Sequence, residues 1–474
     1  MKTSFRKYIL AAALTASAGT MMAQELNSAY FTDDFKYRHD MNAAYGNEQT
    51  YIAIPILGNL NVKLQGSFGV GDVLFKNPYY GNPKYPNAKK TATFMHPGIS
   101  ADEALKGIDK DGNDLIFDID IPIVSVGFKS WGGYNTIEIM ERTHLGMQLP
   151  YEFFDFAKNM SNKEYSFDDL GMRGWSYAEI AFGHSRKIMD NLRVGAKVKI
   201  LLGAAYADFS MNGVSAKMVG DTWLIQGKAR GELMMEGAKF KQVKEEYKTH
   251  PGQYFNRVDG VDYDNAGIGG FGLGLDLGAV YEFKDMDLDW LNGAKVSLAL
   301  KDLGFISWSN TMVAESSGDP FEFSGFKMRY ENGSFESGGD EISDDFKDFA
   351  NLQDKGTESG KTKALAATMR LGVEYPLPVY DKVMFGLLGT HRFDGIYSWT
   401  EGRLSANYEP LKWLNGGLNM AVTSYCTTMG WVLNIHPNAM NIFLGMDHMI
   451  GKTGKSMVPL DSNVSFNFGM NVAF

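Results

Sequence analysis

The last eleven residues of this 474-residue chain alternate between large apolar and small or polar side chains, and the chain ends on a phenylalanine. Because successive side chains of a β-strand point to opposite faces, the segment predicts a strand with one apolar and one polar face. Eleven residues is also about the length that a tilted strand needs to cross the hydrocarbon core of a bilayer. The alternative is the edge strand of a soluble β-sandwich. The apolar face comprises Val464, Phe466, Phe468, Met470, Val472 and Phe474.

Residues 1–23 have the features of a secretory signal peptide. A basic start precedes an apolar run over residues 8–18, and Ala23 supplies a small residue for cleavage. The single cysteine, Cys426, excludes a lipid-accepting cysteine at the cleavage site and a disulfide framework. After the signal no stretch approaches 18 uninterrupted apolar residues, so no transmembrane helix is predicted.

The two-residue period recurs along the chain. A soluble sandwich also alternates, but charged residues opposite apolar ones at mid-strand are what a barrel with a wet lumen contains. Pro55 and Gly58 predict kinks in the first of these strands. The clearest alternating segments are residues 52–70, 192–202, 271–283, 296–300, 365–375 and 464–474.

The connections between the alternating segments are unequal in length. Asn-Gly pairs within two Trp-Leu-Asn-Gly phrases, at 290–293 and 413–416, predict tight hairpin turns, and their tryptophans suit a membrane interface. Short turns on one rim and long polar loops on the other are typical of outer-membrane barrels. The long polar connections are about 72–114, 148–175, 237–268 and 307–362.

These patterns predict an all-β transmembrane antiparallel up-and-down β-barrel with long extracellular loops. An even strand number between 12 and 16 fits the chain. Residues 203–236 either cross the membrane, which gives 16 strands, or form an extracellular hairpin, which gives 14; we predict 14. The expected organisation is a signal peptide (1–23), an N-terminal segment that is a candidate plug (24–50) and the barrel (51–474).

Two motifs resemble those of FadL-like barrels and their PorV-like relatives. One is the Asp276-Leu-Gly-x-x-Tyr281 strand with the strand that follows it, and the other is Asn42-Ala43-Ala44, where the family has proline in place of Ala43. The whole chain resembles a Bacteroidota outer-membrane β-barrel family of unknown function. The terminal phenylalanine resembles the signal by which the barrel-assembly machinery recognises its substrates.

The resemblance implies a location in the outer membrane, in contact with membrane lipid and lipopolysaccharide. It further implies passive transport of a small amphipathic or hydrophobic solute. The alternative is a non-transporting PorV-like scaffold that docks a secretion or surface partner, and a less favoured one is an enzyme at the loop rim. The formal net charge of −10 argues against nucleic acid as a partner.

Charged residues on the polar strand faces are the candidate lumen residues. Seven cations face five carboxylates, which suits either an anionic head group or a lumen filled with ion pairs. The cations are Arg193, Lys197, Lys199, Lys295, Lys301, Arg370 and Arg403, and the carboxylates are Glu179, Asp276, Glu282, Glu374 and Glu409.

No catalytic, cofactor or metal site is predicted. The glycines at 267–272 satisfy a dinucleotide-binding pattern, but a strand follows them where that site needs a helix. Residues 109–114 place glycine fourth, where a calcium-binding EF-hand loop needs it sixth, so an Asp-Gly turn is favoured. His144 and His391 remain candidate partners of a nucleophile, although no nucleophile motif accompanies them.

Overall fold

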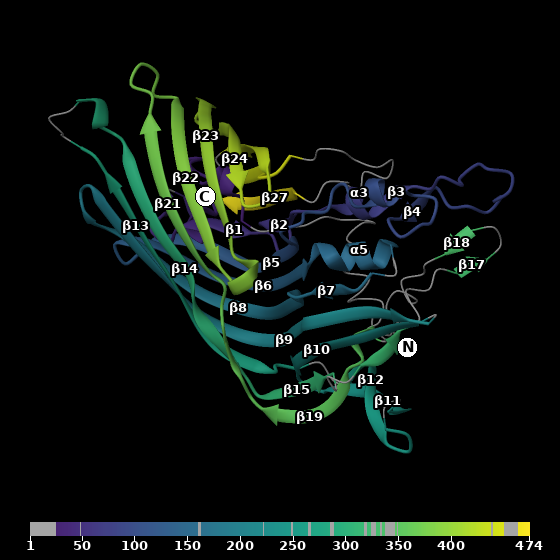
Figure 1. The fold of residues 1–474 in the computed structure, drawn as a ribbon. Helices are drawn as coiled ribbons and strands as arrows, with labels where there is room; N and C mark the ends of the chain where they lie inside the picture. The colour runs from purple at the N-terminus through teal and green to yellow at the C-terminus, as the bar shows by residue number, and fades with distance from the viewer. Residues whose placement is uncertain are drawn as a thin grey trace.

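The structure is a computed structural model, and its strands close into a barrel (Figure 1). The predicted signal peptide lies outside the described residues. Those residues are 25–47, 49–159, 163–220, 222–247, 250–263, 267–284, 289–316, 320–323, 329–331, 334–336, 347, 349–437, 439–449 and 463–474.

Within the described residues the barrel wall has fourteen antiparallel strand positions, which confirms the predicted number. The first position is shared by two short strands, and every other position is one continuous strand. In chain order they are β1 (Tyr51–Ala53) with β2 (Leu60–Gly66), β5 (Asn113–Ser130), β6 (Gly133–Leu149), β8 (Leu170–Met189), β9 (Leu192–Val219), β13 (Gly270–Glu282), β14 (Lys295–Trp308), β21 (Ala367–Pro376), β22 (Val383–Phe393), β23 (Trp399–Leu411), β24 (Leu414–Thr423), β25 (Thr427–Ile435), β26 (Met440–Met446) and β27 (Val464–Ala473).

The C-terminal strand β27 forms the seam that closes the barrel. It pairs with β26 on one side and with β1 and β2 on the other, where Ala473 opposes Tyr51 and Phe468 opposes Leu60. The side chains of its predicted polar face, such as Asn467 and Asn471, are fully buried inside the barrel. Val472 and Phe474 of the apolar face are exposed on the outside, as a lipid-facing strand requires.

The two rims of the barrel differ. One rim carries the C-terminus and short turns such as Trp131-Gly132, and we call it the turn rim. The opposite rim carries the long connections, and we call it the loop rim. The elements of the loop rim are α3 (Val70–Val73), β3 (Leu74–Lys76), β4 (Thr91–Thr93), α4 (Ala101–Ala104), α5 (Tyr151–Asn159), β7 (Tyr165–Phe167), β10 (Thr222–Met235), β11 (Ala238–Glu246), β12 (Tyr254–Tyr263), β15 (Asn310–Glu315), β16 (Phe321–Phe323), β17 (Arg329–Glu331), β18 (Ser334–Glu336), β19 (Gln353–Ser359), β20 (Thr362–Ala364) and η3 (Gly395–Tyr397).

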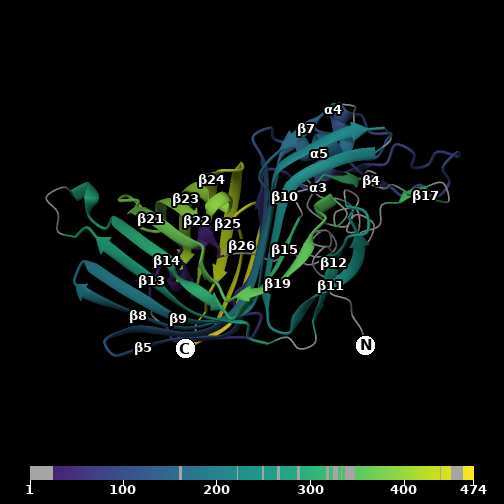
Figure 2. The same ribbon diagram turned by 60° about the horizontal axis from the view of Figure 1, so that its bottom comes forward.

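Strand β9 is long enough to belong both to the wall and to the loop rim. Its first half, up to Gly203, pairs with β13, whereas its second half, from Ala205, pairs with β10. β10 also pairs with β15, which in turn pairs with β19. Residues 203–236 therefore belong to a sheet beyond the wall instead of forming two further membrane crossings. Figure 2 shows this extension rising from the barrel on the side of β9.

The hairpin turn predicted at Asn415-Gly416 lies earlier in the chain. The hairpin between β23 and β24 turns at Lys412 and Trp413, because Leu411 and Leu414 are already paired. Asn415 and Gly416 therefore belong to β24, and the Asn415 side chain points inward, donating a hydrogen bond to a lumen carbonyl. The other Trp-Leu-Asn-Gly sequence, residues 290–293, overlaps the end of the short helix η2 (Asp289–Leu291). There Gly293 adopts a positive φ of 85°, as a tight turn requires.

The wall is apolar outside and polar inside, the reverse of a soluble sandwich. Leucines such as Leu273, Leu371, Leu404 and Leu418 are exposed on the outer face. Many of the alternate side chains that point inward are charged or amide-bearing and are almost completely buried. Among the described residues, no helix is long and apolar enough to span a membrane.

Candidate functional site

The lumen is occupied by the N-terminal segment, residues 25–47, which we call the plug. It contains two short helices, η1 (Asn27–Ala29) and α2 (Arg38–Met41), and all but a few of its side chains are buried. Aromatic residues of the plug pack against inward-facing wall residues, for example Phe35 against Phe443 with ring centroids 4.7 Å apart. The plug begins near mid-lumen and leads, through Thr50, to the turn rim, where Thr50 pairs with Phe474.

Glycines of the wall make room for the predicted plug motif Asn42-Ala43-Ala44. A Cβ added at Gly195 would lie 1.9 Å from the carbonyl oxygen of Ala43, and one at Gly278 would lie 2.1 Å from the Asn42 side chain. Asn42 Nδ2 donates to the β14 carbonyl of Leu298 (3.3 Å), and Asn42 Oδ1 accepts from the amide of Ala44 (2.9 Å). The motif therefore lies close against the wall at Gly195 and Gly278.

A buried lysine ties the plug to two strands. Lys197 Nζ of β9 contacts Asp40 Oδ1 of the plug at 2.6 Å and also contacts Glu138 of β6. His39 joins the same cluster, with its Nδ1 3.2 Å from Asp40 Oδ1 and its Nε2 2.7 Å from the hydroxyl of Tyr51. His39, Asp40 and Glu138 lie close enough to hold a metal ion. In this structure the Lys197 ammonium already contacts both carboxylates.

A second buried cation binds the start of the plug. Arg403 forms a bidentate pair with Glu401, at 2.8 and 2.9 Å, and also donates to the hydroxyl of Ser28 (3.3 Å). Asp447 accepts from the backbone amides of Asn27 (2.9 Å) and Ser28 (2.6 Å), the first amides of η1. Carboxylates bind well at such unpaired amides.

The other predicted lumen residues also point inward. Lys199 contacts Asp276 (2.8 Å) and Asp302 (2.6 Å), and Lys295 contacts Glu374 (2.7 Å). The remaining predicted positions are Arg193, which is half-buried and donates to Ser185; Glu179, which contacts Arg142; Lys301 and Arg370, which contact Glu25; and Glu282 and Glu409, which are partly exposed near the turn rim.

Sequence reasoning missed roughly as many lumen charges as it found. Asp118, Asp120, Glu138 and Arg142 lie on strands whose alternation is visible in the sequence, so the inward position of each could have been predicted from its parity. Glu25 and Asp40 lie in the plug, which has no period to indicate which side chains face a cation.

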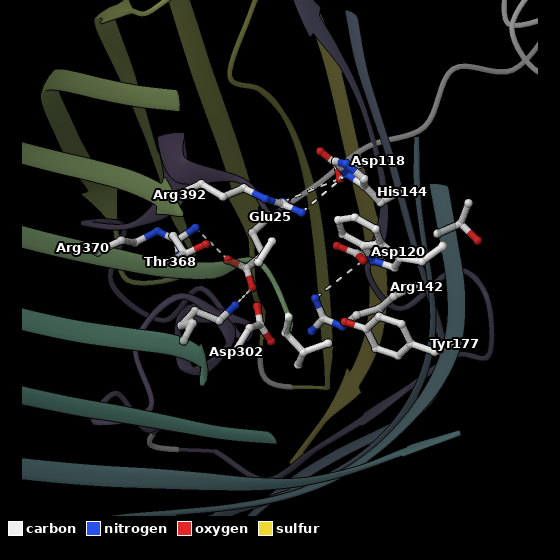
Figure 3. A pocket seen from close by; sticks show the side chains of 15 residues that line it. Glu25, Asp118, Asp120, Arg142, His144, Tyr177, Asp302, Thr368, Arg370 and Arg392 are labelled. Atoms are coloured by element: carbon white, nitrogen blue, oxygen red, sulfur yellow. Dashed lines mark hydrogen bonds and ion pairs between the residues drawn. The ribbon is translucent and has the colours of Figure 1, made fainter. Parts of the chain in front are cut away.

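A small polar cavity lies on the loop-rim side of the plug (Figure 3). Its volume is about 40 Å³, room for a few water molecules. Four cations and four carboxylates line it together with one histidine, so its formal charge is balanced. The charged lining residues are Arg142, Lys301, Arg370, Arg392, Glu25, Asp118, Asp120 and Asp302, and the others are Thr143, His144, Trp175, Tyr177, Leu365, Ala366 and Thr368.

The two histidines considered as catalytic partners lie in different settings. His144 Nδ1 is 2.6 Å from Asp118 Oδ1, and its ring stacks on Trp175 with centroids 4.0 Å apart. Its Nε2 faces the carboxylate of Asp394 at 3.6 Å, where a general base would face a nucleophile. His391 lies outside the cavity lining and bonds Thr400 Oγ1 at 2.8 Å.

The first wall position is interrupted at the predicted kink between β1 and β2. Ile56 has a φ of +68°, which is uncommon for a β-branched residue, and it is exposed on the outer face. Ile56 N donates to the carbonyl oxygen of Pro122 (2.8 Å), and Met470 N donates to that of Leu57 (2.8 Å). Backbone hydrogen bonds to both neighbouring strands therefore seal the interruption.

Comparison with known proteins gives a family and distant structural likenesses. The sequence model of a family of unknown function (DUF5723) matches residues 43–447, and no curated protein matches. A mutant of the TodX monoaromatic hydrocarbon channel is 8% identical, with a TM-score of 0.37 over 96% of this chain and 94% of that one. A Pseudomonas aeruginosa FadL homologue is also 8% identical, with a TM-score of 0.37 over 96% of this chain and 98% of that one. At these values the likenesses carry no argument about activity.

Proposed function

The chain belongs to the family of unknown function DUF5723, and from the geometry of its lumen we propose that it is an outer-membrane barrel through which a small solute passes when the plug moves. The supporting observation is how the plug is attached. Within the described residues, the backbone–backbone hydrogen bonds of residues 25–47 stay inside the segment, and side chains make the hydrogen bonds to the wall. The wall closes without the plug, so the plug can move while the barrel stays intact.

The lining of the lumen favours a polar solute. The cavity next to the plug is walled mainly by charged groups, whereas pockets for hydrophobic ligands are lined by apolar and aromatic side chains. A purely hydrophobic solute would have to displace water from these charges without replacing its hydrogen bonds. We therefore favour a small polar solute over the amphipathic or hydrophobic one that the sequence resemblance implies.

The outer membrane is the proposed location because the outward side chains form an apolar surface around the barrel. In that setting membrane lipid and lipopolysaccharide contact the wall, and the barrel-assembly machinery inserts it.

A scaffold function is the second candidate, and the loop rim favours it. There β10, β15 and β19 form a sheet, and aromatic residues from α5, β7 and β16 pack into a core of their own. Representative members are Phe156, Trp223 and Phe349. A folded layer of this kind could present a docking surface to a secretion or surface partner.

Ion conductance with a loosened plug tests the transport proposal. In Gly278→Val the new side chain would overlap Asn42 Oδ1 and the amide of Ala44, so the plug motif cannot seat. The matched control is Gly402→Val, because an added Cβ at Gly402 meets nothing within 4 Å. We expect Gly278→Val to conduct ions in planar bilayers, while the wild type and Gly402→Val stay closed most of the time. A folded Gly278→Val barrel that stays as closed as the wild type would refute transport and leave the scaffold function as the better explanation.

A further inference from the structure

The plug inserts a carboxylate between two cations of the cavity. Glu25 contacts Lys301 Nζ of β14 and Arg370 Nη2 of β21, the latter at 2.9 Å. Lys301 and Arg370 are each 3% exposed, and Glu25 is the acidic partner that the structure gives to both. Figure 3 shows Glu25 reaching into the cavity between Arg370 on one side and Asp120 and Arg142 on the other.

Glu25 satisfies the two cations incompletely. A carboxylate can bind arginine through two parallel hydrogen bonds, which is the strongest geometry for this pair. Here Glu25 approaches Nη2, and Arg370 Nε is buried without a hydrogen-bond partner in the described residues. A free carboxylate, unconstrained by the plug backbone, could engage both nitrogens.

Two carboxylates on the other side of the same cavity, Asp118 and Asp120, can accept further hydrogen bonds. Asp120 is 3.6 Å from Arg142 Nη1, longer than a direct hydrogen bond. Asp118 Oδ2 is buried and has no hydrogen-bond partner in the described residues, although its other oxygen binds His144. Both carboxylates could accept hydrogen bonds from an ammonium group.

We infer that this cavity is a binding site for a small zwitterion of the amino-acid type, and that Glu25 occupies its carboxylate position in the closed state. Lys301 and Arg370 hold the carboxylate of the solute, and Asp118 and Asp120 hold its ammonium group. Without Glu25 the lining still offers both cations and carboxylates, which fits a ligand that carries both charges. This inference rests on the proposed function, because it names the solute class that would displace the start of the plug.

Equilibrium binding in lipid nanodiscs tests the site without requiring transport. The probes are radiolabelled alanine, propionate, which lacks the ammonium group, and ethylamine, which lacks the carboxylate. Glu25→Gln removes the tethered competitor, so it should bind alanine about tenfold more tightly than the wild type, since a tethered group competes at a high effective concentration. Propionate and ethylamine should bind more weakly than alanine.

Double variants assign the two ends of the ligand. Adding Lys301→Gln to Glu25→Gln should abolish alanine binding, and adding Asp120→Asn should reduce it to the level of propionate. The matched control adds Lys295→Gln, because Lys295 is on the same strand but contacts Glu374 outside the cavity lining. Equal binding of alanine and propionate, or loss of binding in the Lys295→Gln control as well, would overturn the inference.

A second measurement serves if Glu25→Gln does not fold. In a Cys426→Ser background, Ser28→Cys places a thiol at a buried position next to the start of the plug. Alanine, but not propionate, should speed its reaction with a water-soluble maleimide, and unchanged labelling would count against the site. If alanine binds but Gly278→Val does not conduct, the transport proposal is refuted and the zwitterion site is supported. If Gly278→Val conducts but alanine does not bind, the zwitterion site is refuted and the transport proposal is supported.

Discussion

Lys197 is a single side chain whose loss should destabilise the whole barrel. Its ammonium lies between the buried carboxylates of Asp40 and Glu138. We expect Lys197→Met to lower the free energy of unfolding by about 3–5 kcal/mol, because it leaves buried charges unpaired. Urea unfolding in detergent measures this. In the control Lys241→Met, whose pair with Asp262 is exposed and 3.9 Å long, the change should be at most about 1 kcal/mol. Equal losses in the two variants would show that the buried cluster has no special weight.

The sequence could indicate that Lys197 faces the lumen but not which carboxylates it meets. Strand parity follows from the alternation of apolar residues, and Lys197 alternates with apolar residues of its strand. Its partners depend on the registers of β8 with β6 and with β9, and on the path of the plug, where Asp40 lies. Neither register nor path leaves a periodic signal, and this is why Glu25 also escaped prediction.

One deletion can remove the second half of β9 and the neighbouring strands of the loop-rim sheet while leaving the first half of β9 in the wall. Gly203 of β9 and Gly270 of β13 oppose each other in register, so a two-residue turn could join them directly. We expect that replacing residues 204–269 with Asn-Gly leaves a barrel that still shows heat-modifiable migration on gels, because all fourteen wall positions remain. Recovery of only aggregated protein would mean that the loop-rim sheet is needed to close the wall.

The strands were predictable where apolar and polar side chains alternate along the barrel wall, and less so in the loop-rim sheet. The period in residues 192–202 is clear, but β9 continues to Val219, and its second half pairs with β10 beyond the wall. The turn predicted at Asn415-Gly416 was wrong. The Asn-Gly dipeptide fits a hairpin turn, but it also fits a barrel strand whose asparagine amide points inward. The sequence left 16 strands as the alternative to the predicted 14, and the pairing of β9 with both β13 and β10 confirms 14.

The molecule as a whole depends on one closing strand, and its last residue offers a test of assembly. Phe474 is exposed on the outer face at the turn rim, and its backbone exchanges two hydrogen bonds with Thr50, at 2.9 and 3.0 Å. Deleting Phe474 would remove the backbone bonds together with the side chain, so Phe474→Ala is the cleaner change. We expect it to reduce the protein in outer-membrane fractions several-fold while leaving the fold of the inserted molecules unchanged.

The reason is that the resemblance to outer-membrane barrels implies recognition of the terminal aromatic group during assembly, whereas in the finished barrel Phe474 contributes only one outward-facing side chain among many. The control is Phe393→Ala, which removes a similarly exposed outward phenylalanine from the end of β22. If recognition acts through the terminal side chain, only Phe474→Ala should impair assembly. Equal amounts of both variants in the membrane would show that the seam strand is recognised by its alternation and backbone alone.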